Sequence, residues 1–483
     1  MPYPKKILHW IDDRKVESAS GKFFSKINPA TGKPLAQVTR GNAKDVTMAI
    51  VAAQKGFEIW SETTIIKRAD LLRDAVLLMR ERTDEIIDLV VMESGKPRPS
   101  GVGEVAAAIE CGFFYAGEGR RYFGTTLTSS APNRSVWMIR QPIGIGALLT
   151  PFNNPAAGIA WKIFPALLAG NAVILKSHEY TPAVALWYAQ LLKEVGLPAG
   201  VFSVLQGFGA EVGAPLIENA KVRFMSLTGG VKTGQAMLRA GADRFAKVSI
   251  ESGGKNALVV AGDADLEKAA QVVALAGFVD AGQRCSAASR VVVFDSVYDE
   301  FREKLRMKVA DMSVGPDEKD DFGAIISEDR MKAILSTVER AKKAGASLLA
   351  GGKQLKRNGF FIEPTILEDV SKDAEVSTTE LFGPVVILYR VQNFAEAVEI
   401  VNSTDFKLSA SIHTRDIHRA QEFINRVNTG VVRVNGPTHG SEAHMPFGGP
   451  GMSGNGWREP GTQALDFYSE WKQISIDHDP EKV

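Results

Sequence analysis

Cys285 lies in the segment VDAGQRCSAASR and is one of only two cysteines in the chain of 483 residues; the other is Cys111. Small residues follow it, and Arg284 precedes it directly. A cysteine thiolate can attack an electrophilic carbon and carry a covalent intermediate. Most free cysteines, however, are small buried hydrophobes without chemical activity. Cys285 is therefore a candidate nucleophile that needs partners elsewhere in the chain.

Polar side chains at the ends of predicted strands are candidate partners for this thiol. Asn153 and Asn154 stand at a strand-to-helix junction in TPFNNP, where a buried amide needs a partner and could donate to a developing oxyanion. Glu251 ends the run KVSIE before a double glycine, so its carboxylate could act as a base. Ordinary turn chemistry and a solvated acid are the alternative interpretations of these two segments.

Three further segments have the pattern of a nucleotide site. Lys176 and Glu179 follow the strand-like run AVIL and could hold sugar hydroxyls, or form a surface ion pair. LTGGVKTG, residues 227–234, follows a strand and opens a helix, so it could bind an anion at the helix N-terminus or form a plain glycine-rich turn. GFGAEVG, residues 207–213, resembles a dinucleotide fingerprint with its last interval one residue too long, and a simple turn into a helix is the alternative.

Composition argues against several classes of function. The net charge is +1 and basic residues form no blocks, which argues against a nucleic-acid partner. The two cysteines predict neither a disulfide framework nor a metal site, and they fit a reducing, cytoplasmic location. Residues 156–175 are long enough to span a membrane, but Lys162, Pro165, Gly170 and Asn171 interrupt them. We expect a buried strand-and-helix series there and no membrane anchor.

The elements that must position these side chains follow an α/β pattern. Residues 45–60 and 66–94 carry apolar residues at helical spacing, so the first 120 residues are expected to be mostly helical. From residue 144 onward β-rich runs alternate with helices, which predicts parallel βαβ units, and a second such series begins after Glu251. Two extended runs, 135–144 and 464–476, are expected to pair with each other or with a neighbouring subunit.

Taken in order, these segments resemble the motifs of the NAD(P)-dependent aldehyde dehydrogenase family across nearly the whole chain. TPFNNP resembles the family's Pro-Trp-Asn-Phe-Pro element, AWKIFPALLAGNAVILKSHEYTP its Trp-Lys and Lys-x-x-Glu blocks, and SLTGGVKTG its Phe-Thr-Gly-Ser turn. IESGGKNA resembles its Glu-Leu-Gly-Gly-Lys, GQRCSA its Gly-Gln-x-Cys nucleophile, and ELFGPV its Glu-x-Phe-Gly-Pro-Val. PFGG and WREPGTQALDFYSEWK resemble its C-terminal blocks.

The resemblance implies an α/β fold with a Rossmann-type cofactor domain, a second α/β catalytic domain and a small β oligomerisation element. Residues 1–124 and 145–251 would form the NAD(P)-binding domain, and residues 252–450 the catalytic domain. Residues 125–144 and 451–483 would form the oligomerisation strands and the C-terminal segment. The same resemblance implies a homodimer or a homotetramer.

The resemblance also carries roles onto single residues. Cys285 matches the nucleophile, Glu251 the general base and Asn153 the oxyanion amide, while Lys162 and Glu459 match a buried pair that supports the base in some members. The implied cofactor residues are Thr150, Pro151, Phe152, Lys176, Glu179, Gly209, Gly213, Thr228, Gly229, Gly230, Glu251, Ser252, Gly253, Glu380 and Phe382. The candidate substrate-pocket residues are Phe152, Asn154, Trp161, Arg284 and Phe447.

The implied reaction is oxidation of an aldehyde to the acid through a thiohemiacetal and a thioester on Cys285. Glu251 predicts hydrolysis of that thioester, because the CoA-acylating relatives lack this glutamate. NAD is favoured as cofactor because Glu179 would repel the 2′-phosphate of NADP, although Lys176 could tolerate that phosphate. Neither a metal, a nucleic acid nor a membrane is expected as a partner.

The substrate is the open part of this prediction. Arg284 and VNGPTHGSEAHMPFGG resemble the branch that acts on ketoglutaric semialdehyde, and an arginine could bind the distal carboxylate of such a substrate. Aromatic or medium-chain aldehydes are the alternative substrates, since Phe152 replaces the family's tryptophan and Asn154 its phenylalanine. A cofactor-independent cysteine esterase and a cofactor-binding protein without catalysis are alternatives from other functional classes.

Overall fold

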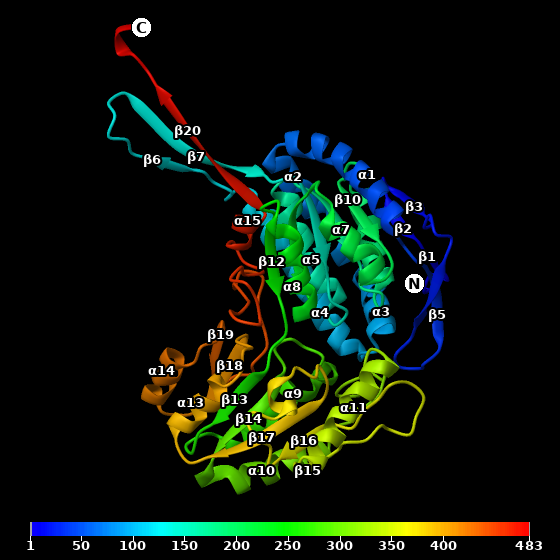
Figure 1. Cartoon of the computed structure of the whole chain (residues 1–483), viewed down its shortest axis with the longest axis vertical. Helices are drawn as coiled ribbons and strands as arrows, with labels where there is room; N and C mark the ends of the chain where they lie inside the picture. The colour runs from blue at the N-terminus through cyan, green and yellow to red at the C-terminus, as the bar shows by residue number, and fades with distance from the viewer. Residues whose placement is uncertain (1, 483) are drawn as a thin grey trace.

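A computed structural model describes residues 2–482 of the chain (Figure 1). The described residues form two seven-stranded sheets and two three-stranded sheets. One large sheet belongs to the N-terminal half, the other to the C-terminal half, and a thin arm of strands projects from the body (Figure 1). The polypeptide crosses from the first large sheet to the second directly after Glu251.

The first large sheet has the strand order β12-β11-β8-β9-β10-β2-β3. Neighbours from β12 to β10 run parallel, and β9 and β10 are buried at every position, as expected for strands covered by helices on both faces. Its parallel strands are β8 (Ile145–Leu149), β9 (Ala172–Lys176), β10 (Phe202–Leu205), β11 (Val222–Thr228) and β12 (Lys247–Glu251). The helices of this half are α1 (Ala43–Glu62), α2 (Ile65–Glu81), α3 (Thr83–Ser94), α4 (Arg98–Glu118), α5 (Pro155–Leu168), α6 (Pro182–Glu194), α7 (Ala214–Glu218) and α8 (Val231–Ala242).

The first 120 residues are mostly helical, as predicted, but residues 6–39 form short strands that no pattern in the sequence predicted. Each run is two to six residues long, too short to show a period of two against a mixed background. Among them, β2 pairs antiparallel with β10 and so extends the first large sheet. The five strands are β1 (Lys6–Ile7), β2 (His9–Ile11), β3 (Arg14–Val16), β4 (Phe23–Ile27) and β5 (Pro34–Thr39).

The second large sheet has the strand order β15-β16-β17-β14-β13-β18-β19, parallel except for the edge strand β15. Its strands are β13 (Asn256–Val260), β14 (Ala288–Phe294), β15 (Ser347–Ala350), β16 (Thr365–Glu368), β17 (Val385–Val391), β18 (Ser409–His413) and β19 (Val431–Val434). Its helices are α9 (Leu266–Phe278), α10 (Asp295–Ala310), α11 (Glu328–Lys343), α12 (Glu375–Thr378), α13 (Phe394–Asn402) and α14 (Ile417–Arg426). The second α/β series predicted after Glu251 is therefore present.

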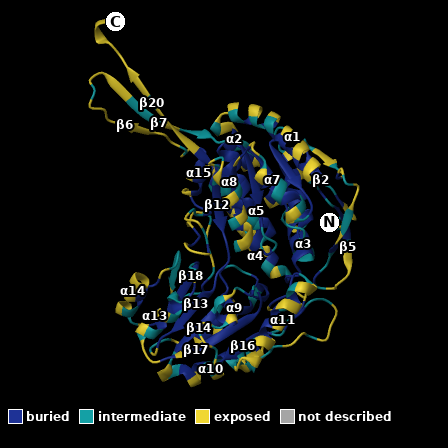
Figure 2. Cartoon of the chain, in the orientation of Figure 1, coloured by how far each residue is buried: buried dark blue, intermediate teal, exposed yellow. Residues whose placement is uncertain are grey.

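The two predicted extended runs pair with each other. β20 (Ser469–Asp477) lies antiparallel to β7 (Arg134–Pro142) from Ser469 opposite Pro142 to Asp477 opposite Arg134. β6 (Thr125–Leu127) pairs with the other edge of β7. The short helix α15 (Ala464–Phe467) joins this arm to the body. Most of the arm is exposed or half-buried (Figure 2).

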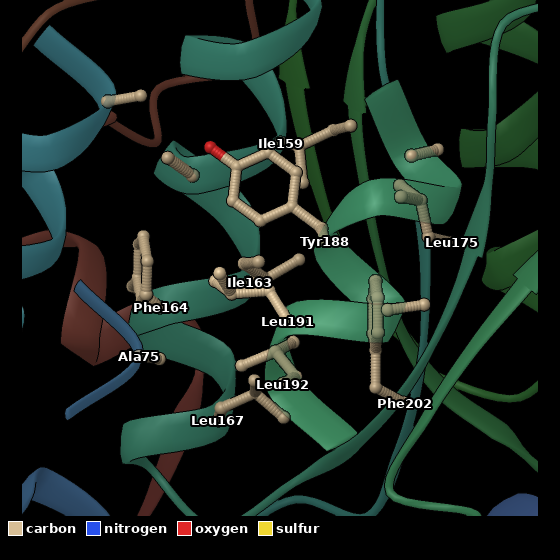
Figure 3. Packing of buried hydrophobic residues seen from close by; sticks show 14 of the residues in the cluster. Ala75, Ile159, Ile163, Phe164, Leu167, Leu175, Tyr188, Leu191, Leu192 and Phe202 are labelled. Atoms are coloured by element: carbon tan, nitrogen blue, oxygen red, sulfur yellow. The ribbon is translucent and has the colours of Figure 1, made fainter. Parts of the chain in front are cut away.

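The apolar stretch at residues 156–175 is a buried helix and strand, as predicted. α5 is buried along most of its length and packs against α6, and Figure 3 shows Ile163, Phe164 and Leu167 of α5 beside Tyr188 and Leu191 of α6. Each such side chain contributes about 1.5–3 kcal/mol when it leaves water. No described helix is both long and apolar enough to cross a membrane.

Candidate active site

A cavity of about 1050 Å³ opens where strands of the first large sheet end. The last residues of four parallel strands line it: Leu149 of β8, Lys176 of β9, Thr228 of β11 and Glu251 of β12. Ligands bind at this end of open parallel sheets because the loops that follow the strands diverge there. The second half of the chain supplies the facing wall, including Cys285.

Nearly all of the predicted site residues meet in this one cavity. Those that line it are Thr150, Pro151, Phe152, Asn153, Asn154, Trp161, Lys176, Glu179, Gly209, Thr228, Gly229, Gly230, Glu251, Ser252, Gly253, Arg284, Cys285, Glu380, Phe382 and Phe447. Three predicted residues do not line it. Lys162 and Glu459 lie behind it as a buried pair, and Gly213 is buried in the π-helical turn Gly209–Gly213 beside Leu149. Of the two glycines of this turn, only Gly209 lines the cavity, and the assignment of Gly213 to the cofactor stays a prediction.

Cys285 is held at the cavity wall by a constrained backbone. Asp280 and Ala281 have φ of 55° and 57°, a left-handed conformation that is rare for residues other than glycine and recurs at functional sites. The Asn256 side-chain amide donates to the Cys285 carbonyl at 2.8 Å. Burial, followed by the charges of Glu380 and Glu251, raises the pKa of Cys285 to about 12. The backbone N–H groups of Cys285 and Ser286 act in the opposite direction by favouring the thiolate.

Glu251 ends β12 with a buried carboxyl group that lacks protein partners. Neither oxygen of its carboxyl group has a hydrogen bond among the described residues. Burial raises its pKa well above the ordinary value, and Glu459 raises it further, while Lys162 and Arg458 lower it. A buried carboxyl without partners is unusual in a native protein and is consistent with a group reserved for water or substrate.

The buried pair behind Glu251 belongs to a closed polar network. Lys162 donates to Glu459 at 2.7 Å and to Ser226 at 2.7 Å. Ser226 and Tyr468 in turn donate to the second carboxylate oxygen of Glu459 at 2.8 and 3.0 Å. The predicted pairing of Lys162 with Glu459 is confirmed, and Ser226 and Tyr468 complete it.

Asn153 lies between β8 and α5 with its side chain on the cavity. That amide has no hydrogen-bond partner among the described residues, so it is available to a ligand. The backbone carbonyl of Asn153 accepts a hydrogen bond from Lys96 at 2.7 Å. Glu104 accepts from the N–H of Ala156 at 2.7 Å and so caps the start of α5, where no side-chain cap of its own exists.

Lys176 and Glu179 form an ion pair of 3.0 Å at one end of the cavity, and their side chains are mostly buried. The alternative of an exposed surface pair is therefore wrong. Burial alone would raise the pKa of Glu179, but the positive charges of His178, when protonated, and of Lys176 lower it overall. Burial lowers the pKa of His178 to about 4, so this ring is neutral at pH 7.

The glycine turns leave the room that a dinucleotide needs. A Cβ atom placed on Gly209 or on Gly230 would meet nothing within 4 Å, so both residues border open cavity space. The N–H of Gly229 already donates to the Glu251 carbonyl at 2.9 Å. An anion would therefore be bound by the N–H of Gly230 and the first turn of α8, which have the orientation that anions favour. The donor set fits NAD(P)+.

Aromatic rings and a second glutamate continue this wall toward Cys285. The ring of Phe152 makes edge contacts with His178, Tyr180 and Phe382 at centroid distances of 5.2, 5.9 and 5.6 Å. Glu380 accepts from the N–H of Gly254 at 3.0 Å, and burial raises its pKa to about 7. These contacts connect the Lys176–Glu179 end with the thiol.

Arg284 lines the cavity, which answers the question that the sequence left open. Its Nε donates to Asp280 at 2.7 Å, whereas its two terminal nitrogens have no partner among the described residues. Burial would raise the pKa of Asp280, but Lys96 and Arg284 lower it to about 2. Trp161 and Phe447 form an apolar wall, with ring centroids 5.8 Å apart.

Sequence reasoning missed part of this lining. Ser100, Gly103, Glu104 and Ala107 lie on one face of α4, and their spacing of three and four residues is the signal that could have identified them. No local signal in the sequence marks several of the other cavity residues as part of a site. Among them are Asp280, His178, Tyr180, His439, Gly440 and Ser441, together with Arg330 at the start of α11.

Comparisons with known proteins agree with this geometry. A profile of the aldehyde dehydrogenase family matches residues 15–474. The alpha-ketoglutarate semialdehyde dehydrogenase of Haloferax volcanii is 37% identical over 472 residues, covering 96% of this chain and 98% of that protein. The alpha-ketoglutaric semialdehyde dehydrogenase of Bacillus subtilis is 36% identical over 476 residues, covering 97% and 98%.

Solved structures with the same fold include enzymes of both cofactor types. Betaine aldehyde dehydrogenase from Staphylococcus aureus in complex with NAD+ superimposes with a TM-score of 0.95 at 30% identity, covering 98% of this chain and 95% of that one. An NADP-dependent enzyme from E. coli superimposes with a TM-score of 0.95 at 35% identity, covering 98% of both chains. With a cysteine, an unpartnered buried glutamate and a dinucleotide cradle around one cavity, this chain belongs to the aldehyde dehydrogenase family.

Proposed function

We propose that this enzyme oxidises a semialdehyde with a carboxylate at its far end, of the ketoglutaric semialdehyde type, to the corresponding dicarboxylic acid. The observation that carries the proposal is the free guanidinium edge of Arg284 in the cavity wall, directly before the nucleophile. The names of the relatives in Haloferax volcanii and Bacillus subtilis support the same substrate.

Asp280 makes Arg284 suitable for this task. It engages only Nε and so fixes the plane of the guanidinium group, while the two terminal nitrogens stay available. A guanidinium edge with two parallel N–H donors matches a carboxylate in a bidentate arrangement. A substrate whose aldehyde lies at Cys285 and whose carboxylate lies at Arg284 is thereby bound at both ends.

The residues of the chain carry the chemistry as follows. Cys285 loses its thiol proton to water, its sulfur bonds to the aldehyde carbon, and the resulting alkoxide accepts hydrogen bonds from the Asn153 side chain and the Cys285 N–H. Loss of one such donor costs roughly 3–4 kcal/mol. NAD(P)+, when bound, supplies the hydride acceptor. Glu251 then takes a proton from water, the hydroxide attacks the thioester carbon, the C–S bond breaks to release the carboxylic acid, and Glu251 returns its proton to the Cys285 thiolate.

We favour NAD over NADP as the cofactor. The ionised carboxylate of Glu179 can accept hydrogen bonds from both hydroxyl groups of the adenosine ribose, and it would repel a 2′-phosphate. Lys176 is already paired with Glu179 at 3.0 Å, so it is not free to compensate for that repulsion.

The substrate proposal is tested with three aldehydes: ketoglutaric semialdehyde, glutaric semialdehyde, which lacks the oxo group, and pentanal, which lacks the carboxylate. Arg284→Met is expected to lower kcat/KM for both semialdehydes roughly 10- to 100-fold, since hydrogen bonds to charged groups contribute about 1.5–3 kcal/mol. The value for pentanal should change less than about threefold by the same reasoning.

Arg330→Met is the matched control, because Arg330 also lines the cavity but donates to the Leu381 carbonyl at 2.8 Å. This variant should not change the preference for carboxylated substrates. If wild-type enzyme prefers pentanal, or if Arg284→Met lowers all three values equally, the substrate proposal is wrong and an apolar aldehyde is the better assignment.

The remaining assignments concern the whole molecule. We propose that the arm of β6, β7 and β20 joins copies of the chain into a homodimer or homotetramer, supported by its exposed Leu127, Trp471 and Ile476. We also propose that residues 1–124 and 145–251 form the cofactor domain and residues 252–450 the catalytic domain, with residues 125–144 and 451–483 as oligomerisation strands and C-terminal segment. A cytoplasmic location is supported by two cysteines that are both free.

A further inference from the structure

Lys96 is a buried ammonium beside the oxyanion amide. It stands between α3 and α4, and its side chain is only 5% exposed. Its Nζ donates to Glu104 at 2.9 Å and to the backbone carbonyl of Asn153 at 2.7 Å. A third contact, to the side chain of Asn154, measures 3.3 Å. Burying a charge is costly unless it is paired and hydrogen-bonded, and these three acceptors meet that condition for Lys96.

Glu104 connects the same ammonium to the start of α5. One carboxylate oxygen accepts from Lys96, and the other accepts from the N–H of Ala156 at 2.7 Å. The pair therefore fixes the carbonyl of Asn153 from one side and the first turn of α5 from the other. A negative charge is also favourable at that helix end.

The Asn153 side chain, by contrast, has nothing of its own to hold it. Its amide forms no hydrogen bond with any described residue, although it borders the cavity. The orientation of the amide therefore depends on the backbone of residues 153–156, to which Lys96 and Glu104 both bind.

We propose that Lys96, held by Glu104, is the positioning residue that aims the Asn153 amide at the alkoxide formed on Cys285. The proposal rests on the proposed oxyanion role of Asn153 and not on the identity of the substrate. Oxyanion stabilisation depends on donors that already point to where charge develops, and a displacement of about 1 Å can cost on the order of a hundredfold in rate.

The same ammonium also lies near Asp280, which lines the cavity. Lys96 Nζ lies 4.0 Å from the Asp280 carboxylate, and Asp280 holds Arg284 through its other oxygen. One short chain of charges thus runs from the arginine that is proposed to bind the substrate carboxylate to the amide that is proposed to stabilise the alkoxide.

The test replaces Lys96 by methionine, which keeps the length of the side chain and removes its donors. Two reactions are followed: acylation of Cys285 by 4-nitrophenyl acetate without cofactor, detected by intact mass, and oxidation of propanal with NAD+. We expect both rates to fall roughly 10- to 100-fold, with the KM for NAD+ within about twofold of the wild-type value. Neither compound carries a carboxylate, so an error in the proposed substrate leaves this result unchanged.

A double-mutant cycle separates positioning from a general structural effect. If Lys96 acts through the Asn153 amide, Lys96→Met in an Asn153→Ala background should lower the acylation rate by less than about threefold, because coupled residues are not additive. If Lys96→Met lowers the acylation rate by the same factor with and without Asn153→Ala, the proposal is contradicted. It is also contradicted if the Lys96→Met single variant acylates at the wild-type rate.

Two further variants guard against misfolding. Glu104→Gln keeps one oxygen, which can accept from the N–H of Ala156, and replaces the acceptor of Lys96 by an NH2 donor, so it should fold and show a smaller loss of the same kind. Lys26→Met is the matched control, since Lys26 is also a buried ammonium that holds a backbone carbonyl, that of Glu93, at 2.8 Å. It should lower thermal stability but leave acylation within about twofold, and an equal loss of acylation in Lys26→Met would overturn the specific role of Lys96.

Discussion

At Cys285, burial and the carboxylates of Glu380 and Glu251 all raise the pKa of the thiol. Each favours the neutral thiol, and together they raise the pKa of Cys285 to about 12. A thiol is a nucleophile only as thiolate, so the protein without cofactor holds its nucleophile largely protonated.

This protonation state predicts a pH dependence for alkylation. In the free enzyme the rate at which iodoacetamide alkylates Cys285 should rise about tenfold per pH unit from pH 7 to pH 10. It should not reach the plateau that is expected above a free-cysteine pKa of about 8.5. Glu380→Gln should raise the alkylation rate above pH 7, because it removes the carboxylate whose charge raises the Cys285 pKa more than that of Glu251 does. The measurement is modified protein per unit time by intact mass.

Cys285→Ser is the control, since it leaves only the fully buried Cys111. A plateau near pH 8.5 in the wild-type protein would show that burial does not hold the thiol protonated. An unchanged rate in Glu380→Gln would separately show that its carboxylate does not act on the sulfur.

At the scale of elements, close backbone packing decides whether the base can work. Gly448 has φ of 139°, and a Cβ atom there would lie 2.3 Å from an oxygen of Glu251. The loop after β19 therefore approaches the end of β12 more closely than any residue with a side chain allows. The carboxyl group keeps its place because this position is glycine.

Gly448→Ala should therefore have the same effect as removal of the Glu251 carboxylate. We expect a single burst of NAD(P)H at near-normal amplitude, followed by steady turnover lowered at least roughly tenfold, because acylation precedes the water step that needs Glu251. Glu251→Gln should give the same signature. The two phases are resolved by stopped-flow absorbance.

Gly436→Ala is the control in the same loop region, since a Cβ there would have only a 4.0 Å contact. It should leave both phases unchanged. Loss of the burst itself in Gly448→Ala would mean that the substitution disturbs the nucleophile rather than the base.

For the whole molecule, the arm of β6, β7 and β20 is the feature that a single chain does not explain. It carries exposed Leu127 and Ile476, and Figure 1 shows it projecting away from both large sheets. Exposed apolar strands of this kind are suited to pairing with another chain.

The variant Leu127→Asp/Ile476→Asp is expected to lower the molar mass in solution to that of a monomer or dimer, because each charge would be buried without a partner at the proposed interface. Multi-angle light scattering measures this mass directly. Met307→Asp, at an exposed apolar residue of α10 far from the arm in Figure 1, should leave it unchanged. A wild-type protein that is monomeric at micromolar concentration would contradict the proposal.

The sequence by itself determined the identity of the chemical groups and the class of fold. Strand-and-helix alternation is encoded locally, so the parallel units around Lys176 and Glu251 could be predicted. The order of the family's motifs then indicated Cys285 as the candidate nucleophile, Glu251 as the candidate base and Asn153 as the candidate oxyanion donor. It could not predict strands β1–β5, whose two to six residues are too short to carry a period.

Only the tertiary structure decided how those groups are surrounded. It placed Arg284 on the cavity with Asp280 as its anchor, placed Gly213 away from the cavity lining, and occupied the N–H of Gly229 with a backbone hydrogen bond. It also brought Lys96 to the Asn153 carbonyl across 57 positions of sequence. Contacts of this kind depend on how separate elements pack, and no local pattern of residues records the direction in which a side chain finally points.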